Sequence, residues 1–158
     1  MRILGIDPGY ETLGFGLIEL NGTDWEAVDY GVITTDSGDA MPDRLLQIYE
    51  DLQTLFEDLS PDIVSMEDLF FCQNITSGLQ VAEARGVIQL VVAEAGLPLY
   101  EYKPNEVKLC ITGYGQASKS QMQKMAQEIL NLSSIPTPDD AADALCIALT
   151  CAFDRVRV

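Results

Sequence analysis

The stretch RILGIDPGY, residues 2–10, places one carboxylate, Asp7, at the end of an apolar run and directly before Pro8 and Gly9. The apolar run is typical of a buried β-strand, and Pro-Gly predicts a turn immediately after it. Asp7 either closes an Asx turn or serves as a chemical group at the mouth of the strand. These nine residues alone favour neither interpretation, so the rest of the chain must decide.

Two further β-type segments follow, at residues 13–20 and 27–35. The Asn21-Gly22 pair between them predicts a hairpin turn. Together with residues 3–7, these segments predict three antiparallel strands.

The next part of the chain alternates between helix and strand. Apolar residues recur every three or four positions over 42–59, which predicts an amphipathic helix on the sheet. A short strand at 62–67 ends in a second acid, Glu67. Residues 76–95 predict a helix that is apolar nearly all round in its second half, and such a helix needs cover on two sides. We therefore expect a subunit contact there, before a further strand at 97–102.

Three helices complete the predicted fold, at residues 104–111, 118–130 and 137–153. Thr137 is expected to cap the last helix, with Pro138 as its first helical residue. Strands first, followed by alternating helices and strands, predict an α/β domain with a mixed sheet.

Length and composition limit the class of protein. The 158 residues are 47% hydrophobic, enough to bury a core, and fit one domain, residues 1–158. No run is apolar over the roughly eighteen residues that a membrane span needs, and the N-terminus has no secretion-signal pattern. We therefore expect a soluble, cytoplasmic protein with no membrane partner. The four cysteines lack a metal-binding spacing and are expected to act as small apolar residues.

The charge balance is unusual, with 9 Lys and Arg against 25 Asp and Glu and a formal net charge of -16. Such a charge repels other polyanions at low salt, so taken alone it argues against binding to nucleic acid. The chain has no histidine. Any acid–base or metal chemistry must therefore use carboxylates.

Four carboxylates are candidates for a common site. Asp7 and Glu67 both end apolar strands, and strands that end at one edge of a sheet bring such side chains together. Asp140 and Asp143 lie three positions apart, so on a helix they project roughly 60° from each other. Carboxylates this close repel one another unless a cation lies between them. Oxygen ligands without histidine or thiolate favour Mg²⁺ or Mn²⁺.

Each acid also has a purely structural interpretation. Asp140 taken alone is better explained as a favourable charge at a helix N-terminus. Asp143 is harder to explain in this way, because Asp is a poor residue inside a helix. Glu67 is harder still, because an ionised carboxylate at the end of a buried strand is costly unless it is paired or bound to metal. These two costly acids indicate a functional site.

Six short motifs occur in order along essentially the whole chain: GIDPG at 5–9, Glu67–Phe71, ARG at 84–86, TGYG at 112–115, SKSQ at 118–121 and DDAADAL at 139–145. In these motifs the sequence resembles the RuvC family of bacterial Holliday-junction resolvases, most closely its cyanobacterial branch. One such motif would be weak evidence, since GIDxG also opens actin-like ATPases and sugar kinases. Six motifs in order are specific, and 158 residues hold only one domain of this kind, with no second phosphate-binding half.

The resemblance implies an RNase H-like fold, with a mixed sheet, antiparallel first three strands and helices on both faces. It also implies a homodimer through helix 76–95 that works beside a branch-migration complex of the RuvA and RuvB type. The activity implied is metal-dependent hydrolysis that nicks two opposing strands of a four-way DNA junction symmetrically and leaves 5′-phosphates. Asp7, Glu67, Asp140 and Asp143 would be the catalytic acids and would hold two Mg²⁺ ions per subunit, with Mn²⁺ as a substitute.

The resemblance implies further contacts with DNA. Lys108 and Lys119 match lysines near the scissile phosphate, and Lys119 would also take part in catalysis. Phe70 matches an aromatic residue that stacks on a base at the junction, and Gln73 and Asn74 would contact DNA beside it. Without the resemblance, Lys108 is better explained as a solvated helix residue and Phe70 as a core residue. Lys119 needs another explanation, because a cation in the first helical turn opposes the helix dipole.

The acidic charge departs from the family pattern, whose members are generally basic. Where relatives place a basic residue against DNA this chain has Gln73, and Asp68 stands where the branch often has a cation. Losing such cations weakens DNA binding more than it alters a metal site. The acidity fits adaptation to high salt, a redesigned surface, or a relative kept for a protein partner. The alternative function is therefore an acidic, non-catalytic dimeric module with the same fold.

Overall fold

A five-stranded mixed sheet forms the centre of the computed structural model, which describes residues 1–68 and 75–156, with side chains in the second range from residue 78 onward. The strands lie in the order β3-β2-β1-β4-β5. The β3-β2-β1 pairs are antiparallel, and the β1-β4 and β4-β5 pairs are parallel. The elements are β1 (Arg2–Asp7), β2 (Thr12–Asn21), β3 (Asp24–Thr34), α1 (Met41–Leu59), β4 (Ile63–Glu67), α2 (Ile75–Glu94), β5 (Leu99–Tyr102), α3 (Pro104–Thr112), α4 (Lys119–Ile129) and α5 (Asp139–Arg155).

Every predicted helix and strand is present in the predicted order, with boundaries that differ by at most three residues. The hairpin turn is tighter than expected, because Asn21 pairs with Asp24 and β3 therefore begins earlier. The start of α5 also differs, since Pro138 is the extended N-cap rather than the first helical residue. Its carbonyl accepts the bonds from the amides of Ala141 and Ala142 that begin the helix.

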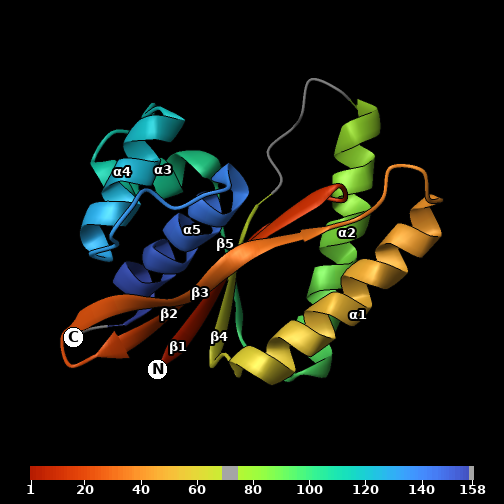
Figure 1. Ribbon diagram of the computed structural model, residues 1–158, viewed down its shortest axis with the longest axis horizontal. Helices are drawn as coiled ribbons and strands as arrows, with labels where there is room; N and C mark the ends of the chain where they lie inside the picture. The colour runs from red at the N-terminus through yellow and green to blue at the C-terminus, as the bar shows by residue number, and fades with distance from the viewer. Residues whose placement is uncertain (69–74, 157–158) are drawn as a thin grey trace.

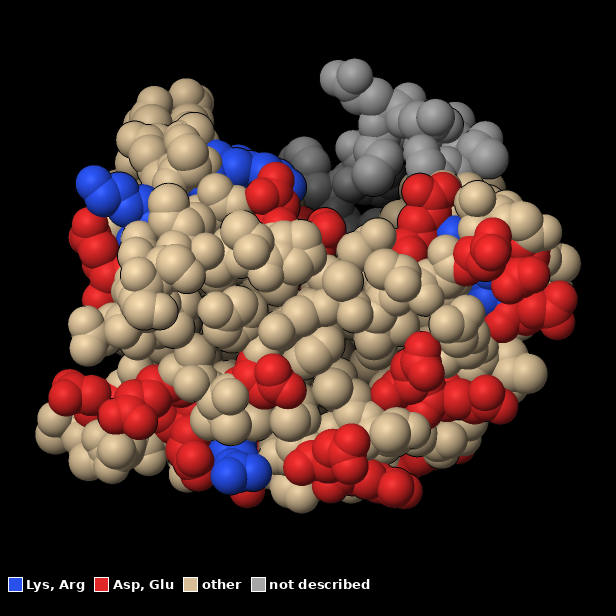
Figure 2. Space-filling view, in the orientation of Figure 1, with Lys and Arg blue, Asp and Glu red and all other residues tan. Residues whose placement is uncertain are grey.

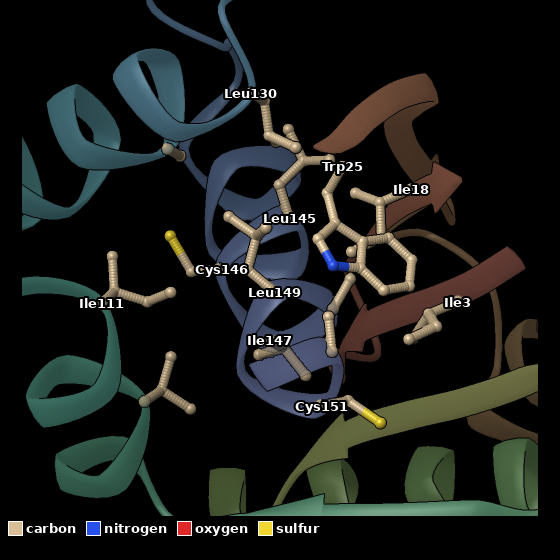
Figure 3. Close-up of a cluster of buried hydrophobic side chains, with 14 of the residues drawn as sticks. Ile3, Ile18, Trp25, Ile111, Leu130, Leu145, Cys146, Ile147, Leu149 and Cys151 are labelled. Atoms are coloured by element: carbon tan, nitrogen blue, oxygen red, sulfur yellow. The ribbon is translucent and has the colours of Figure 1, made fainter. Parts of the chain in front are cut away.

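Helices cover both faces of the sheet, as Figure 1 shows: α3, α4 and α5 lie on one side, and α1 and α2 lie on the other. Successive side chains of β1 point to opposite faces of the sheet and so contribute to two hydrophobic cores. Ile3 packs with α5, while Leu4 packs with α1 and α2. Trp25 on β3 completes the α5 side, where it lies beside Leu145 and Leu149 (Figure 3).

Two of the four cysteines behave as predicted and one does not, while Cys72 lies outside the described residues. Cys146 and Cys151 are fully buried in the α5 core (Figure 3), where they pack as small apolar residues. Cys110 on α3 is exposed, so the prediction was wrong for that residue. Cys110 lies on the outer side of α3, whereas Val107 and Ile111 form its buried side. Among the described residues, no helix is long and apolar enough to cross a membrane.

The close approach of α5 to the backbone of β1 depends on a glycine. A Cβ atom added to Gly5 would lie 2.0 Å from the carbonyl oxygen of Ala144 and 2.7 Å from the amide nitrogen of Ala148. Those are backbone atoms of α5, which cannot rotate aside as a side chain can. A side chain at this position would therefore push the helix away from the sheet.

Replacing Gly5 with alanine should strongly destabilise the protein. Because the clash is with backbone, we expect Gly5→Ala to lower the free energy of unfolding by at least about 3 kcal/mol. Gly115→Ala is the control, since a Cβ there meets only the carbonyl oxygen of Asn105, at an ordinary 3.7 Å, and it should change stability by less than about 1 kcal/mol. Urea denaturation of both variants makes the comparison, and a stability close to wild type for Gly5→Ala would contradict this account of the packing.

Candidate active site

Asp7 and Glu67 end neighbouring parallel strands at the same edge of the sheet. The β1–β4 register pairs Ile3 with Ile63 and runs without a shift to Ile6 and Met66, so the two acids are next in line. Both lie on the face that α5 covers, because side chains alternate and the hydroxyl of Ser65 lies 3.4 Å from the Ile147 carbonyl. Asp7 therefore ends its strand on the face of the sheet that a helix covers.

The first turn of α5 brings two more acids to this edge. Gly14 pairs with Asp7 across the β1–β2 ladder. A Cβ atom on Gly14 would lie 2.1 Å from the carbonyl oxygen of Asp140, so the helix begins directly against β2 beside Asp7. Asp143 follows one turn later. Four carboxylates from three elements therefore surround the carboxyl ends of β1 and β4.

Burial and neighbouring negative charge raise the pKa of Asp7, Glu67 and Asp143. Burial and then the charges of Glu67, Asp143 and Asp140 raise the pKa of Asp7 from an ordinary 3.8 to about 8. Burial and the charge of Asp143 raise the pKa of Glu67 to about 7. Burial likewise raises the pKa of Asp143, although Lys119 opposes that effect. Without metal, Asp7 therefore binds a proton far more readily than an ordinary aspartate does.

Lys119, at the start of α4, pairs with the acidic end of α5. Its Nζ lies 3.3 Å from a carboxylate oxygen of Asp143 and 3.9 Å from one of Asp139. Burial lowers the pKa of Lys119, but the charges of Asp143 and Asp139 outweigh it and raise the pKa overall. A cation in the first turn of a helix needs a compensating partner, and the two aspartates of α5 provide it for Lys119.

A pocket of about 200 Å³ opens between the sheet edge and helices α3 to α5. Its wall includes Glu67, Asp143, Lys108 and Lys119. Lys108 lies near enough to Glu67 to lower its pKa, against the stronger effect of burial. The pocket therefore combines carboxylates with two ammonium groups, a pairing suited to a phosphate held beside a cation.

The donor set fits a hard divalent cation. The four acids offer only oxygen ligands, and the raised pKa of Asp7 records a repulsion that a cation between the carboxylates would relieve. The side chains do not form a closed cage as they stand. In the described part of the chain, no three His, Cys, Asp or Glu side chains are grouped closely enough to hold an ion. The acids are thus neighbours that repel, with Asp143 turned to Lys119.

Three of the predicted DNA-binding residues, Phe70, Gln73 and Asn74, lie outside the described residues.

The structure also shows two residues near the site that the sequence did not predict there. Asp139 contacts Lys119, and its position directly before Asp140 could have indicated this role. Arg85 was noted only within a motif, yet it contacts the main chain of Glu67. A lone arginine in an apolar helix could have indicated this, since a buried guanidinium needs partners.

A mixed sheet of this order, with acids at the ends of β1 and β4 and on the covering helix, defines an RNase H-like domain. The family model described as Crossover junction endodeoxyribonuclease RuvC matches residues 3–151. A Chloroflexus aggregans protein of that description is 50% identical over 97% of this chain and 93% of its own length.

Solved structures agree with this assignment. The Thermus thermophilus RuvC structure superposes with a TM-score of 0.89 at 33% identity, covering 97% of this chain and 94% of that one. T. thermophilus RuvC in complex with Holliday junction substrate gives a TM-score of 0.88 at 30% identity and the same coverage. The chain belongs to the RuvC family of crossover junction endodeoxyribonucleases. None of these comparisons supports the non-catalytic alternative, and the cyanobacterial branch stays a prediction.

The raised pKa values predict how stability depends on pH without metal. Asp7 and Glu67 bind protons more tightly in the folded than in the unfolded state, so stability is greatest below their unfolded pKa values. The free energy of unfolding should therefore fall as pH rises from about 4 to about 8. At pH 8 in EDTA, Asp7→Asn should be more stable than wild type by on the order of 2 kcal/mol.

Chemical denaturation at pH 5 and pH 8 tests this expectation, with the Asp51→Asn variant of α1 as the control. The stability difference between Asp7→Asn and wild type should be larger at pH 8 than at pH 5. An equal difference at the two pH values would show that the pKa of Asp7 is not raised in the folded protein.

Proposed function

We propose that this protein resolves four-way DNA junctions by metal-dependent hydrolysis, placing symmetric nicks in two opposing strands and leaving 5′-phosphates. The observation that carries the proposal is the group of mutually repelling carboxylates at the end of β1 and β4, in a chain of the RuvC family. The structure of a relative with a Holliday junction substrate supports the same substrate here. The whole chain, residues 1–158, would act as one nuclease domain.

We propose Asp7, Glu67, Asp140 and Asp143 as ligands of two Mg²⁺ ions, which Mn²⁺ can replace. Bound ions would polarise the attacking water and stabilise the leaving 3′-oxygen of an in-line displacement. Asp7 must release its proton before it can act as a ligand, because its metal-free pKa is about 8. Asp143 must likewise turn from Lys119.

Lys119 is then released to contact the scissile phosphate, as the family resemblance implies, and Lys108 would contact the same strand from the other wall of the pocket. Phe70 would stack on a junction base, with Gln73 and Asn74 beside it. These roles rest on the resemblance. The positions of the two lysines around one pocket support those assigned to them.

The distribution of charge supports DNA binding despite the net charge. Lys103, Lys108, Lys119 and Lys124 are four of the nine basic residues, and the segment that they span contains one acid, Glu106. Figure 2 shows basic side chains at the upper left, over α3 and α4, and acidic ones along the lower edge, over α1 and the β2–β3 hairpin. These lysines thus lie beside the active site, whereas many of the acids outside the site lie over α1 and the β2–β3 hairpin.

A second subunit would supply the second nick. We propose that α2 packs against α2 of another copy, because two leucines on this helix, Leu79 and Leu90, remain 62% and 52% exposed. The proposed setting is the cytoplasm, beside a branch-migration complex of the RuvA and RuvB type.

Junction cleavage tests the function directly. With Mg²⁺ or Mn²⁺, wild-type protein should nick a synthetic mobile four-way junction at symmetric positions, and EDTA should abolish cleavage. Asp7→Asn should lower the cleavage rate at least about 1000-fold, because a carboxylate proposed to hold the metal ions is lost. A salt series should give only a shallow loss of junction affinity as ionic strength rises, because few lysines contact phosphate and salt also screens the repulsion from distant acids. Wild-type protein that is dimeric and folded but neither binds nor cuts would contradict the proposal and restore the non-catalytic alternative.

The dimer is testable on its own. Leu90→Glu places a charge at the centre of the proposed contact, so light scattering should report a monomer that has lost paired nicking. Leu46→Glu on α1 is the matched control, since Leu46 is similarly exposed at 55% and should leave the dimer intact. A wild-type protein that is monomeric at micromolar concentration would refute the contact.

A further inference from the structure

Arg85 lies in the middle of α2 with its side chain only 8% exposed. Its guanidinium donates a hydrogen bond to the main-chain carbonyl of Glu67 and pairs with the carboxylate of Glu101 on β5. A longer contact of 3.5 Å joins it to Asp68. One side chain of α2 therefore reaches the ends of both β4 and β5.

The contact with Glu67 is the informative one. A buried arginine needs partners, and Glu101 together with Asp68 would satisfy its charge without any further role. The bond to a backbone carbonyl adds no charge compensation. Instead it fixes the peptide group of the residue whose carboxylate faces the active-site pocket.

The end of β4 is held more firmly on its β5 side than on its β1 side. The pairing of β4 with β1 reaches Ile6 and Met66, one residue short of Glu67. On the other side, Glu67 pairs with Tyr102 of β5, and the amide of Asp68 donates to the Tyr102 carbonyl at 2.8 Å. Arg85 adds the hydrogen bond that joins this strand end to α2.

We propose that Arg85 is a positioning residue that holds the main chain of Glu67, and so sets the direction of its carboxylate toward the metal and the scissile phosphate. The inference rests on the proposed function and deepens it. The planar guanidinium can donate to the Glu67 carbonyl and to Glu101 at once, in directions fixed by its geometry. A lysine ammonium in the same place keeps the charge but cannot span both partners.

Residues that orient a ligand typically contribute 10- to 100-fold in metal affinity or activity. Loss of the guanidinium group should therefore lower the rate of the cleavage step and the affinity for metal, while junction affinity stays unchanged. A merely structural arginine would instead change stability alone.

The experiment compares Arg85→Lys with wild type and with Arg2→Lys. Arg2 is the matched control, because it also joins a carboxylate, Glu19, and a main-chain carbonyl, that of Leu59, but at the opposite end of β1. Amide hydrogen exchange at Asp68 is measured without metal or DNA. Single-turnover cleavage, junction affinity in Ca²⁺ and a Mn²⁺ titration follow on the same preparations.

Arg85→Lys should speed Asp68 exchange on the order of tenfold, slow cleavage and weaken Mn²⁺ binding on the order of tenfold, and leave junction affinity within about twofold. Arg2→Lys should match wild type in all four. Wild-type exchange at Asp68, or wild-type cleavage and Mn²⁺ affinity, in a folded Arg85→Lys variant would overturn the inference.

A second variant covers the case in which Arg85→Lys does not fold. Glu101→Gln keeps the arginine and removes the charge that orients it, so smaller changes in the same direction are expected, and wild-type values would overturn the inference. The failures are separable. If wild-type protein itself does not cut the junction, the proposed function fails, whereas exchange at Asp68 still decides whether Arg85 holds the strand end.

Discussion

The contact between the backbone of α5 and the backbones of β1 and β2 is the constraint on which the rest of this structure depends. Gly5 and Gly14 leave no side chain between sheet and helix, and alanines such as Ala144 and Ala148 complete the close approach. The helix therefore lies lower on the sheet than bulkier residues would allow. Its first turn then meets the ends of β1 and β4.

That approach has an electrostatic consequence. Asp140 and Asp143 are carried into the neighbourhood of Asp7 and Glu67, where burial and like charge oppose ionisation. A core packed for stability alone would not gather acids at one sheet edge. The proposed metal ions would offset this cost, and a site for phosphodiester hydrolysis would differ in this way from an ordinary strand end.

Charge is organised on two scales in this protein. Over the whole chain, acids outnumber basic residues and give a net charge of -16, whereas the segment from Lys103 to Lys124 carries four lysines and one acid. If DNA binds beside these lysines as proposed, they would contribute most to the potential there, because charges farther than a Debye length are screened by salt. A buried charge is not screened by salt and needs direct partners. The donors of Arg85 have them in neighbouring carboxylates and a main-chain carbonyl.

Local residue patterns in the sequence were sufficient to predict the helices, the strands, their order and the candidate acids. Periodicity, turn residues and strand-ending carboxylates are properties of neighbours in the chain, and the six collinear motifs pointed to the family before any geometry was known. The lysine-rich segment 103–124 was also present in the sequence, although the net charge obscured it.

Only the tertiary structure decided which residues meet across long separations. It paired Lys119 with Asp143 and Asp139, and it turned Cys110 outward while burying Cys146. It also placed Arg85 against the main chain of Glu67. Such contacts depend on how far helices approach the sheet and at what angle. Those distances are set by the packing of all the layers together, and no local pattern in the sequence encodes them.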